Sequence, residues 1–283
     1  MKNRIIILMF GLILFGCGPS TNNETTTKQL LIGGASGTEL AEDQVFRKNN
    51  GSDPGTLDPH RAEGVPASNV LRDLYEGLVS EEANGNYIPG VAESWTISDD
   101  GKTYRFKIRD TALWSNGDRI VAEDFVFSLR RSVDPKTLSN YSSMLYPIKN
   151  ARDVVLGKLS PNALGVYAES DKILVIELEE PTPYFISLLT HSTTYPVHPP
   201  SVTKHGSAFT RPENMISNGA FTLSNWRIQD YILLTRNEKY WDDANTTLSQ
   251  VYYYPLDNPD ASLRRYRANE LDFTDTTPSE QLP

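Results

Sequence analysis

The chain has 283 residues, a formal net charge of −9, 10 % aromatic and 22 % charged side chains, and one cysteine. An acidic chain lacks the basic surface that phosphate binding requires, so these values exclude nucleic acid as the expected partner. They also exclude a mainly disordered chain and an internal disulfide, and the length is enough to bury a sizeable core.

The first 16 residues have the layout of an export signal. Lys2 and Arg4 precede an apolar run from Ile5 to Phe15. This run is too short to cross a bilayer as a stable helix. We therefore expect residues 1–16 to be a signal peptide that is removed from the mature protein.

The sequence Leu14-Phe15-Gly16-Cys17 resembles the lipobox of bacterial lipoproteins, in which the cysteine is acylated and becomes the new N-terminus. Two or three acyl chains, at about 0.8 kcal/mol per buried methylene, would make this attachment effectively permanent. The alternative is an ordinary signal peptide with a chance cysteine. Because residues 18–29 contain no large apolar side chain, we expect residues 17–40 to form a flexible tether, with 30–41 as a linker or a loose first strand.

Periodic patterns in the rest of the chain predict a mixed α/β fold. Alternation of Tyr104, Phe106 and Ile108 predicts a half-buried strand over residues 103–109. Residues 122–133 carry apolar side chains at helical spacing, and Asp134-Pro135 ends the pattern. Further expected strands are 173–178, 231–236 and 251–254, and further expected helices are 68–78, capped by Ser68, and 259–269.

Several segments, in this order, resemble the substrate-binding lipoproteins of oligopeptide ABC importers, the bacterial extracellular solute-binding proteins of family 5. They are NNGSDPGTLDPHRAEGVPASNVLRDLYEGL, PGVAESWTISDDGKTYRFKIR, WSNGD, AEDFVFSLRR and SNGAFTLSNW. The resemblance implies a bilobed, periplasmic-binding-protein-like α/β fold of type II that closes on an extended peptide. The resemblance also implies that the peptide-loaded protein docks on a membrane permease.

Pro196, Pro199 and Pro200 interrupt regular secondary structure in the middle of the chain, and together with the resemblance they indicate a domain boundary there. Residues 41–76 and 199–283 are expected to form a first, incomplete lobe. Residues 77–198 are expected to form an inserted second subdomain.

The resemblance also assigns candidate ligand contacts. It places Glu63, Gly64 and Val65 where such proteins present main chain to a peptide, and Tyr141 at a ligand-contacting position. The competing interpretations are a plain turn before a helix at Ser68 and a half-buried loop tyrosine. Asp275, Thr276 and Thr277 fall near another ligand-lining segment of the family, although their local sequence differs from the family pattern.

The sequence contains no pattern that predicts an enzyme. It has no Gly-x-Ser-x-Gly elbow, and the seven-residue spacing of His198 and His205 is not one that metal sites use. His60 and His191 have no evident partner in the sequence. We expect no cofactor and no metal. The alternatives to oligopeptide binding are the same fold binding a dipeptide, a nickel complex, a cell-wall peptide or a sugar, and, more distantly, an exported hydrolase.

Residues 277–280 have the marks of a helix start, yet the sequence ends at Pro283. Members of the family continue through a further lobe that closes the cleft, so we expect a fragment, a truncated product or a natural shortening. This form should bind peptide weakly or not at all. The expected protein is a monomer, exported and lipid-anchored at the outer face of the cytoplasmic membrane or in the periplasm, with an ABC permease as partner.

Overall fold

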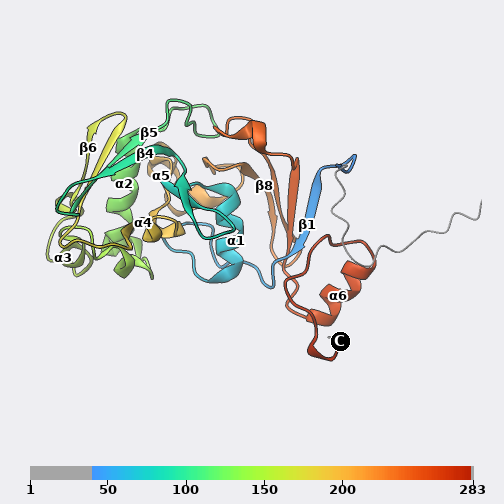
Figure 1. Cartoon of the computed structure of the whole chain (residues 1–283). Helices are drawn as coiled ribbons and strands as arrows, with labels where there is room; N and C mark the ends of the chain where they lie inside the picture. Colours follow the sequence, from blue (N-terminus) through green and yellow to red (C-terminus); the bar gives the residue numbers. More distant parts are fainter. Residues whose placement is uncertain (1–39, 282–283) are drawn as a thin grey trace, which may run out of the picture. The chain divides into compact units, whose positions relative to one another are not determined.

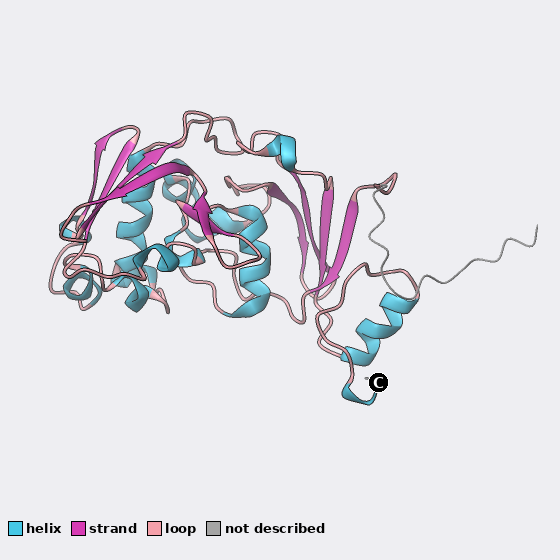
Figure 2. Cartoon of the chain, in the orientation of Figure 1, coloured by secondary structure: helices cyan, strands magenta, loops and turns pink. Residues whose placement is uncertain are grey.

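The structure, a computed structural model, describes residues 40–281 (Figures 1 and 2). The predicted signal peptide, Cys17 and the tether up to residue 39 lie outside this range. Within it, no helix combines the length and the apolar character that a membrane span requires. The elements are two four-stranded sheets, a short hairpin and several α-helices, which confirms the mixed α/β prediction.

The first sheet has the strand order β1-β10-β9-β8. Its strands are β1 (Val45–Asn49), β10 (Gln250–Tyr254), β9 (Tyr231–Arg236) and β8 (Phe221–Arg227). β1 is parallel to β10, whereas the other two pairings are antiparallel. One face of this sheet packs against α1 (Gly64–Leu74), which lies beside β8 in Figure 1. The buried cluster between them, which we call the α1 core, draws its apolar side chains from residues 57–75, 195 and 221–253.

The second sheet is antiparallel throughout, in the order β4-β5-β7-β6. Its strands are β4 (Ala92–Ile97), β5 (Thr103–Ile108), β7 (Ile173–Glu177) and β6 (Val166–Ser170). The helix α2 (Ala122–Val133) packs on β6 and β7. The cluster around this helix, which we call the α2 core, draws its buried side chains from residues 78–189. The predicted lobe boundaries at 76/77 and 198/199 stay a prediction.

The remaining elements are short. A hairpin pairs β2 (Val79–Glu81) with β3 (Tyr87–Pro89). The other helices are α3 (Ala151–Val155), α4 (Phe185–Leu188), α5 (Pro199–His205) and α6 (Pro259–Arg267). The predicted helix start at residues 277–280 corresponds only to a 3₁₀ turn, Ser279–Gln281.

Most predicted elements are confirmed to within two residues. α2 begins and ends where its apolar stripe predicts, and Phe125, Val126 and Leu129 are buried. β9 has its predicted bounds, and the alternating side chains of β5 point into the core, as predicted. Asn258 caps α6 by accepting a hydrogen bond from the Ala261 N–H at 2.9 Å.

The prediction for the first helix is wrong at both ends, because the helix spans Gly64–Leu74 rather than residues 68–78. Ser68 therefore lies inside the helix and caps nothing. Pro66 fits the first turn because that turn needs no N–H donor from it. At the other end the chain leaves the helix at Tyr75, whose backbone is extended with φ −131° and ψ 152°.

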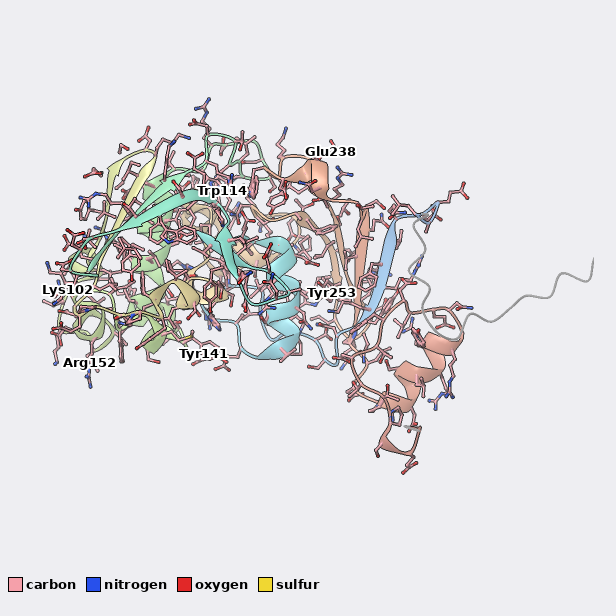
Figure 3. All side chains as sticks on the ribbon, in the orientation of Figure 1. Lys102, Trp114, Tyr141, Arg152, Glu238 and Tyr253 are labelled. Atoms are coloured by element: carbon pink, nitrogen blue, oxygen red, sulfur yellow. The ribbon has the colours of Figure 1, made fainter. Side chains whose placement is uncertain are left out.

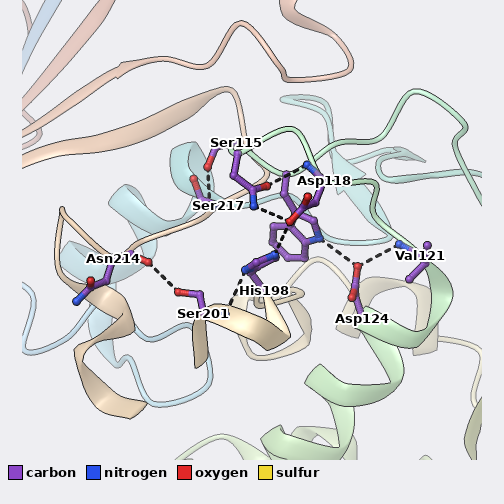
Figure 4. A network of polar contacts seen from close by, with 10 residues as sticks. Ser115, Asp118, Val121, Asp124, His198, Ser201, Asn214 and Ser217 are labelled. Carbon is purple, nitrogen blue, oxygen red and sulfur yellow. Dashed lines mark hydrogen bonds and ion pairs between the residues drawn. The ribbon is translucent and has the colours of Figure 1, made fainter. Parts of the chain in front are cut away.

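Polar contacts surround the segment between Trp114 and α2, as Figure 4 shows. Asp124, in the first turn of α2, accepts hydrogen bonds from the indole N–H of Trp114 and from the Val121 N–H, both at 3.1 Å. His198, just before α5, lies 3.2 Å from a carboxylate oxygen of Asp118. The Asp124 contacts order the segment between Trp114 and α2, and the His198–Asp118 contact holds this segment against the one that leads into α5.

Candidate functional site

A pocket of about 220 Å³ lies at the start of α1. Its lining comes from α1, from the residues just before α1 and from two loops that are far apart in the sequence; the residues are Ala62, Gly64, Val65, Ser68, Tyr141, His191 and Ser192. We call it the small pocket. Figure 3 shows Tyr141 on the same side of the molecule as the start of α1. Three of the four residues predicted as principal peptide contacts therefore line one pocket.

The backbone at the start of α1 is open to a ligand. Glu63 has extended geometry, with φ −131° and ψ 150°, and no side chain caps the helix. Gly64 has φ +80°, which side-chain-bearing residues rarely adopt. The first N–H groups of a helix have no partner within it, so these donors are available to an external acceptor. Val65, in the first turn of α1, is 67 % exposed, which is unusual for a valine in a helix that packs on a core.

The opposite wall of the small pocket contains an aromatic pair. The rings of Tyr141 and His191 meet edge to face, with centroids 5.1 Å apart. His191 Nδ1 accepts a hydrogen bond from the Thr193 N–H at 3.2 Å. Burial, assisted by the charge of Arg72, lowers the pKa of His191 below its ordinary 6.5. The imidazole is therefore neutral at pH 7 and carries its proton on Nε2, where it can act as a donor.

The other predicted contacts lie outside the small pocket. Glu63 is exposed and directly precedes α1. Asp275, Thr276 and Thr277 are exposed and line no described pocket. They belong to a segment fixed at the end of β1, where the Asn49 side-chain amide donates to Asp275 at 3.3 Å.

The end of β1 also contacts the start of α1. The Asn50 side-chain amide donates to the Pro66 carbonyl at 3.0 Å and accepts from the Asn69 side chain, also at 3.0 Å. Since Asn49 holds the 275–277 segment, consecutive asparagines tie both predicted contact segments to one strand end. The two segments are neighbours but do not share a pocket.

A larger pocket, of about 560 Å³, lies at the other end of α1. Its lining includes Arg72, Glu76, the β2 end of the hairpin and Tyr240. The Glu76 carboxylate accepts a hydrogen bond from the Tyr240 hydroxyl and another from the Trp241 indole N–H, both at 2.6 Å. The guanidinium of Arg109 lies 3.7 Å from the centre of the Trp241 ring.

Sequence reasoning missed this larger pocket and four contributors to the small one, Ala62, Ser68, His191 and Ser192. His191 and Ser192 are about 50 residues from Tyr141, so no local pattern indicates that they meet. Arg72 and Glu76 belong to a segment that carries the family resemblance, and no local pattern marks either of them as lining a pocket. His60, which had no evident partner, lies 2.7 Å from the Arg131 guanidinium through Nδ1.

The described residues contain no group of three or more His, Cys, Asp or Glu side chains that could hold a metal ion. Glu81 and Glu82, which are neighbours in the sequence, are both exposed near the hairpin turn.

Residues 86–283 match a family model described as bacterial extracellular solute-binding proteins, family 5 Middle. The chain therefore belongs to this family of solute-binding proteins, which are not enzymes.

Its relatives include peptide receptors. The periplasmic oligopeptide-binding protein OppA of Salmonella typhimurium is 44 % identical over 240 residues, which are 84 % of this chain and 44 % of that protein. The crystal structure of Haemophilus influenzae OppA in complex with the peptide RPPGFSPFR aligns with a TM-score of 0.84 at 42 % identity, covering 86 % of this chain and 48 % of that one.

Another relative has a different named ligand. The probable deoxycholate-binding periplasmic protein YgiS of Escherichia coli is 44 % identical over 248 residues, 87 % of this chain and 46 % of that protein. The chain spans about half the length of the relatives it matches. Over that half, the predicted periplasmic-binding-protein-like α/β fold is confirmed.

Proposed function

We propose that this chain forms one wall of the ligand cleft in the substrate-binding protein of an ABC importer, and that the ligand is an oligopeptide. The observation that carries the proposal is the small pocket, where Gly64 and Val65 meet Tyr141 and His191. Unpaired main-chain donors suit a ligand whose main chain is its constant part. An aromatic hydroxyl and a neutral imidazole suit a wall that is partly apolar and partly wet.

In this proposal Glu63, Gly64, Val65 and Tyr141 contact the peptide, and the 275–277 segment borders the site. The chain spans about half the length of its relatives. We therefore expect these 283 residues alone to bind peptides with a Kd on the order of 1 mM, since a single wall offers only part of the contacts.

Binding of this strength is measurable by NMR. A tripeptide added to the purified chain should shift the amide signals of Gly64 and Val65. Tyr141→Ala should weaken binding about fivefold, the loss of roughly 1 kcal/mol of contact. Tyr167→Ala, at a 40 % exposed tyrosine on β6, should leave the affinity unchanged.

Deoxycholate serves as the second ligand in this titration, because one relative is named for it. Shifts at Gly64 with deoxycholate and none with free peptides would replace the peptide by a bile acid as the proposed ligand. The absence of shifts with either would overturn the role of the small pocket.

We also propose that the protein works outside the cytoplasm, as a monomer tethered through lipid at Cys17 beside a permease. The lipobox-like sequence and the periplasmic names of the relatives support this proposal. Cys17→Ser should move the protein from the membrane fraction to the soluble fraction of fractionated cells. Retention of the variant on the membrane would refute the lipid anchor.

A further inference from the structure

Two segments of the chain, α1 and residues 190–192, contribute to the lining of both the small and the large pocket. On one side, α1 contributes Gly64, Val65 and Ser68 to the small pocket and Arg72 to the large one. Gly64, Ser68 and Arg72 are spaced by four residues, so they lie on one face of the helix. On the other side, Thr190 lines the large pocket, and the next residues, His191 and Ser192, line the small one.

Arg72 lines the large pocket and lies one helical turn beyond Ser68, which lines the small pocket. Its charge contributes to the lowered pKa of His191 in the small pocket and also acts on Tyr195 in the large one. The side chain is exposed, and among residues 40–281 no carboxylate lies within ion-pair distance of its guanidinium. Three glutamates line the large pocket, but Glu76 is already bound to Tyr240 and Trp241, and neither Glu81 nor Glu82 pairs with Arg72.

We infer that Arg72 binds the C-terminal carboxylate of a peptide that runs along α1 from the small pocket. This inference rests on the proposed peptide binding at Gly64 and Val65. A guanidinium presents donors in a planar fork that matches a carboxylate, which makes arginine the natural partner for this group.

The geometry of α1 sets a length requirement. Eight residues separate Gly64 from Arg72, and a helix rises by 1.5 Å per residue, so the two positions are about 12 Å apart along the axis. An extended peptide covers about 3.3 Å per residue. A chain of about four residues is therefore needed to reach from one position to the other, and a dipeptide is too short.

The test compares Ala-Ala with penta-alanine, each as a free acid and as a C-terminal amide, by NMR titration of the purified chain. Amidation should weaken penta-alanine about tenfold and leave the dipeptide unchanged. Arg72→Gln should weaken the free-acid pentapeptide by the same factor and should not weaken the amide further, because both changes remove one interaction. Arg264→Gln, an exposed arginine on α6, makes the same charge change as a control.

The outcomes separate the two proposals. Peptide binding that is insensitive to amidation, or an Arg72→Gln loss that is equal for both lengths, overturns the role of Arg72 and leaves peptide binding in place. A wild-type chain that shows no shifts with any of the four peptides overturns both.

Discussion

The fold changes the protonation of Glu76, a carboxyl group at the end of α1. It follows α1 and accepts hydrogen bonds from Tyr240 and Trp241, two residues of the segment after β9. Burial raises the pKa of its carboxyl to about 7; the two hydrogen bonds and the charge of Arg109 oppose the shift, and Asp242 adds to it. Glu76 is therefore only partly ionised at neutral pH, although it accepts two short hydrogen bonds.

A raised carboxyl pKa makes stability depend on pH in a definite direction. Between the ordinary value of 4.5 and about 7, the folded chain holds the Glu76 proton more tightly than the unfolded chain does. The contribution of Glu76 to stability is thus greatest below pH 4.5 and decreases as the pH rises towards 7. His60 acts in the opposite direction, because burial and the nearby charge of Arg131 lower its pKa to about 4.

Comparison with Glu76→Gln isolates the contribution of Glu76 from that of His60. Between pH 5 and 8 the wild-type free energy of unfolding should fall by about 2 kcal/mol relative to the variant, since glutamine does not titrate. Urea denaturation at several pH values measures this difference. Glu82→Gln, at an exposed residue beside the hairpin turn, should follow the wild type. A pH-independent difference between wild type and Glu76→Gln would contradict the raised pKa.

At the scale of elements, the sequence predicts best where a local pattern decides the structure. The bounds of α2 follow from its apolar stripe and from Asp134-Pro135. β10 covers the predicted strand 251–254 and starts one residue earlier, and its side chains alternate, with Tyr253 buried and Tyr252 and Tyr254 half-buried. In both elements the periodicity acts over a dozen residues or fewer, and in α2 a stop signal also sets the end.

α1 shows where local reasoning fails. Its first residues, Gly64, Val65 and Pro66, have the composition of a turn, and only the tertiary structure makes them the first turn of a helix. The chain leaves the helix at Tyr75 because the junction beyond it is crowded. A side chain at Gly219 would lie 2.5 Å from the Asp73 carbonyl oxygen, so the backbone of the 218–220 turn packs directly on the helix end.

The same contrast between local and distant contacts decides which residues of the candidate site the sequence could predict. The resemblance predicted Gly64, Val65 and Tyr141, and the structure brings these residues together. His191 and Arg72 could not be predicted, because their neighbours come from distant parts of the chain. Such contacts depend on how α1 packs against the 190–192 segment, and no sequence period encodes that packing.

At the scale of the whole molecule, one buried ion pair joins the two cores. Arg131 of α2 donates to both carboxylate oxygens of Asp58, at 2.9 and 2.6 Å, and Leu57 next to Asp58 belongs to the α1 core. Burial opposes ionisation of Asp58, yet the hydrogen bonds and charge of Arg131, with His60, more than offset it and lower the pKa. Neutral His60 accepts from Arg131 and donates to the Tyr195 carbonyl at 2.9 Å.

Arg131→Met should lower the free energy of unfolding by about 3 to 5 kcal/mol, because it leaves the Asp58 carboxylate buried without a cation. Arg105→Met is the matched control. Arg105 pairs with Glu169 at 3.5 Å, but both side chains are nearly half exposed, so the loss should stay below about 1 kcal/mol. Adding Asp58→Asn to Arg131→Met should restore part of the stability, since no buried charge then remains unpaired.

Urea denaturation followed by tryptophan fluorescence tests this coupling, because Trp114 belongs to the α2 core and Trp226 packs against the α1 core. If the ion pair couples the two cores, Arg131→Met should also reduce the denaturant m-value, as the cores begin to unfold separately. A loss no larger than that of Arg105→Met, with an unchanged m-value, would show that apolar packing alone holds the cores together. The proposed peptide path along α1, from the small pocket to Arg72, would then depend on that packing. The segment opposite α1, residues 190–192, lies in the sequence between the α2 core and most of the sheet residues of the α1 core.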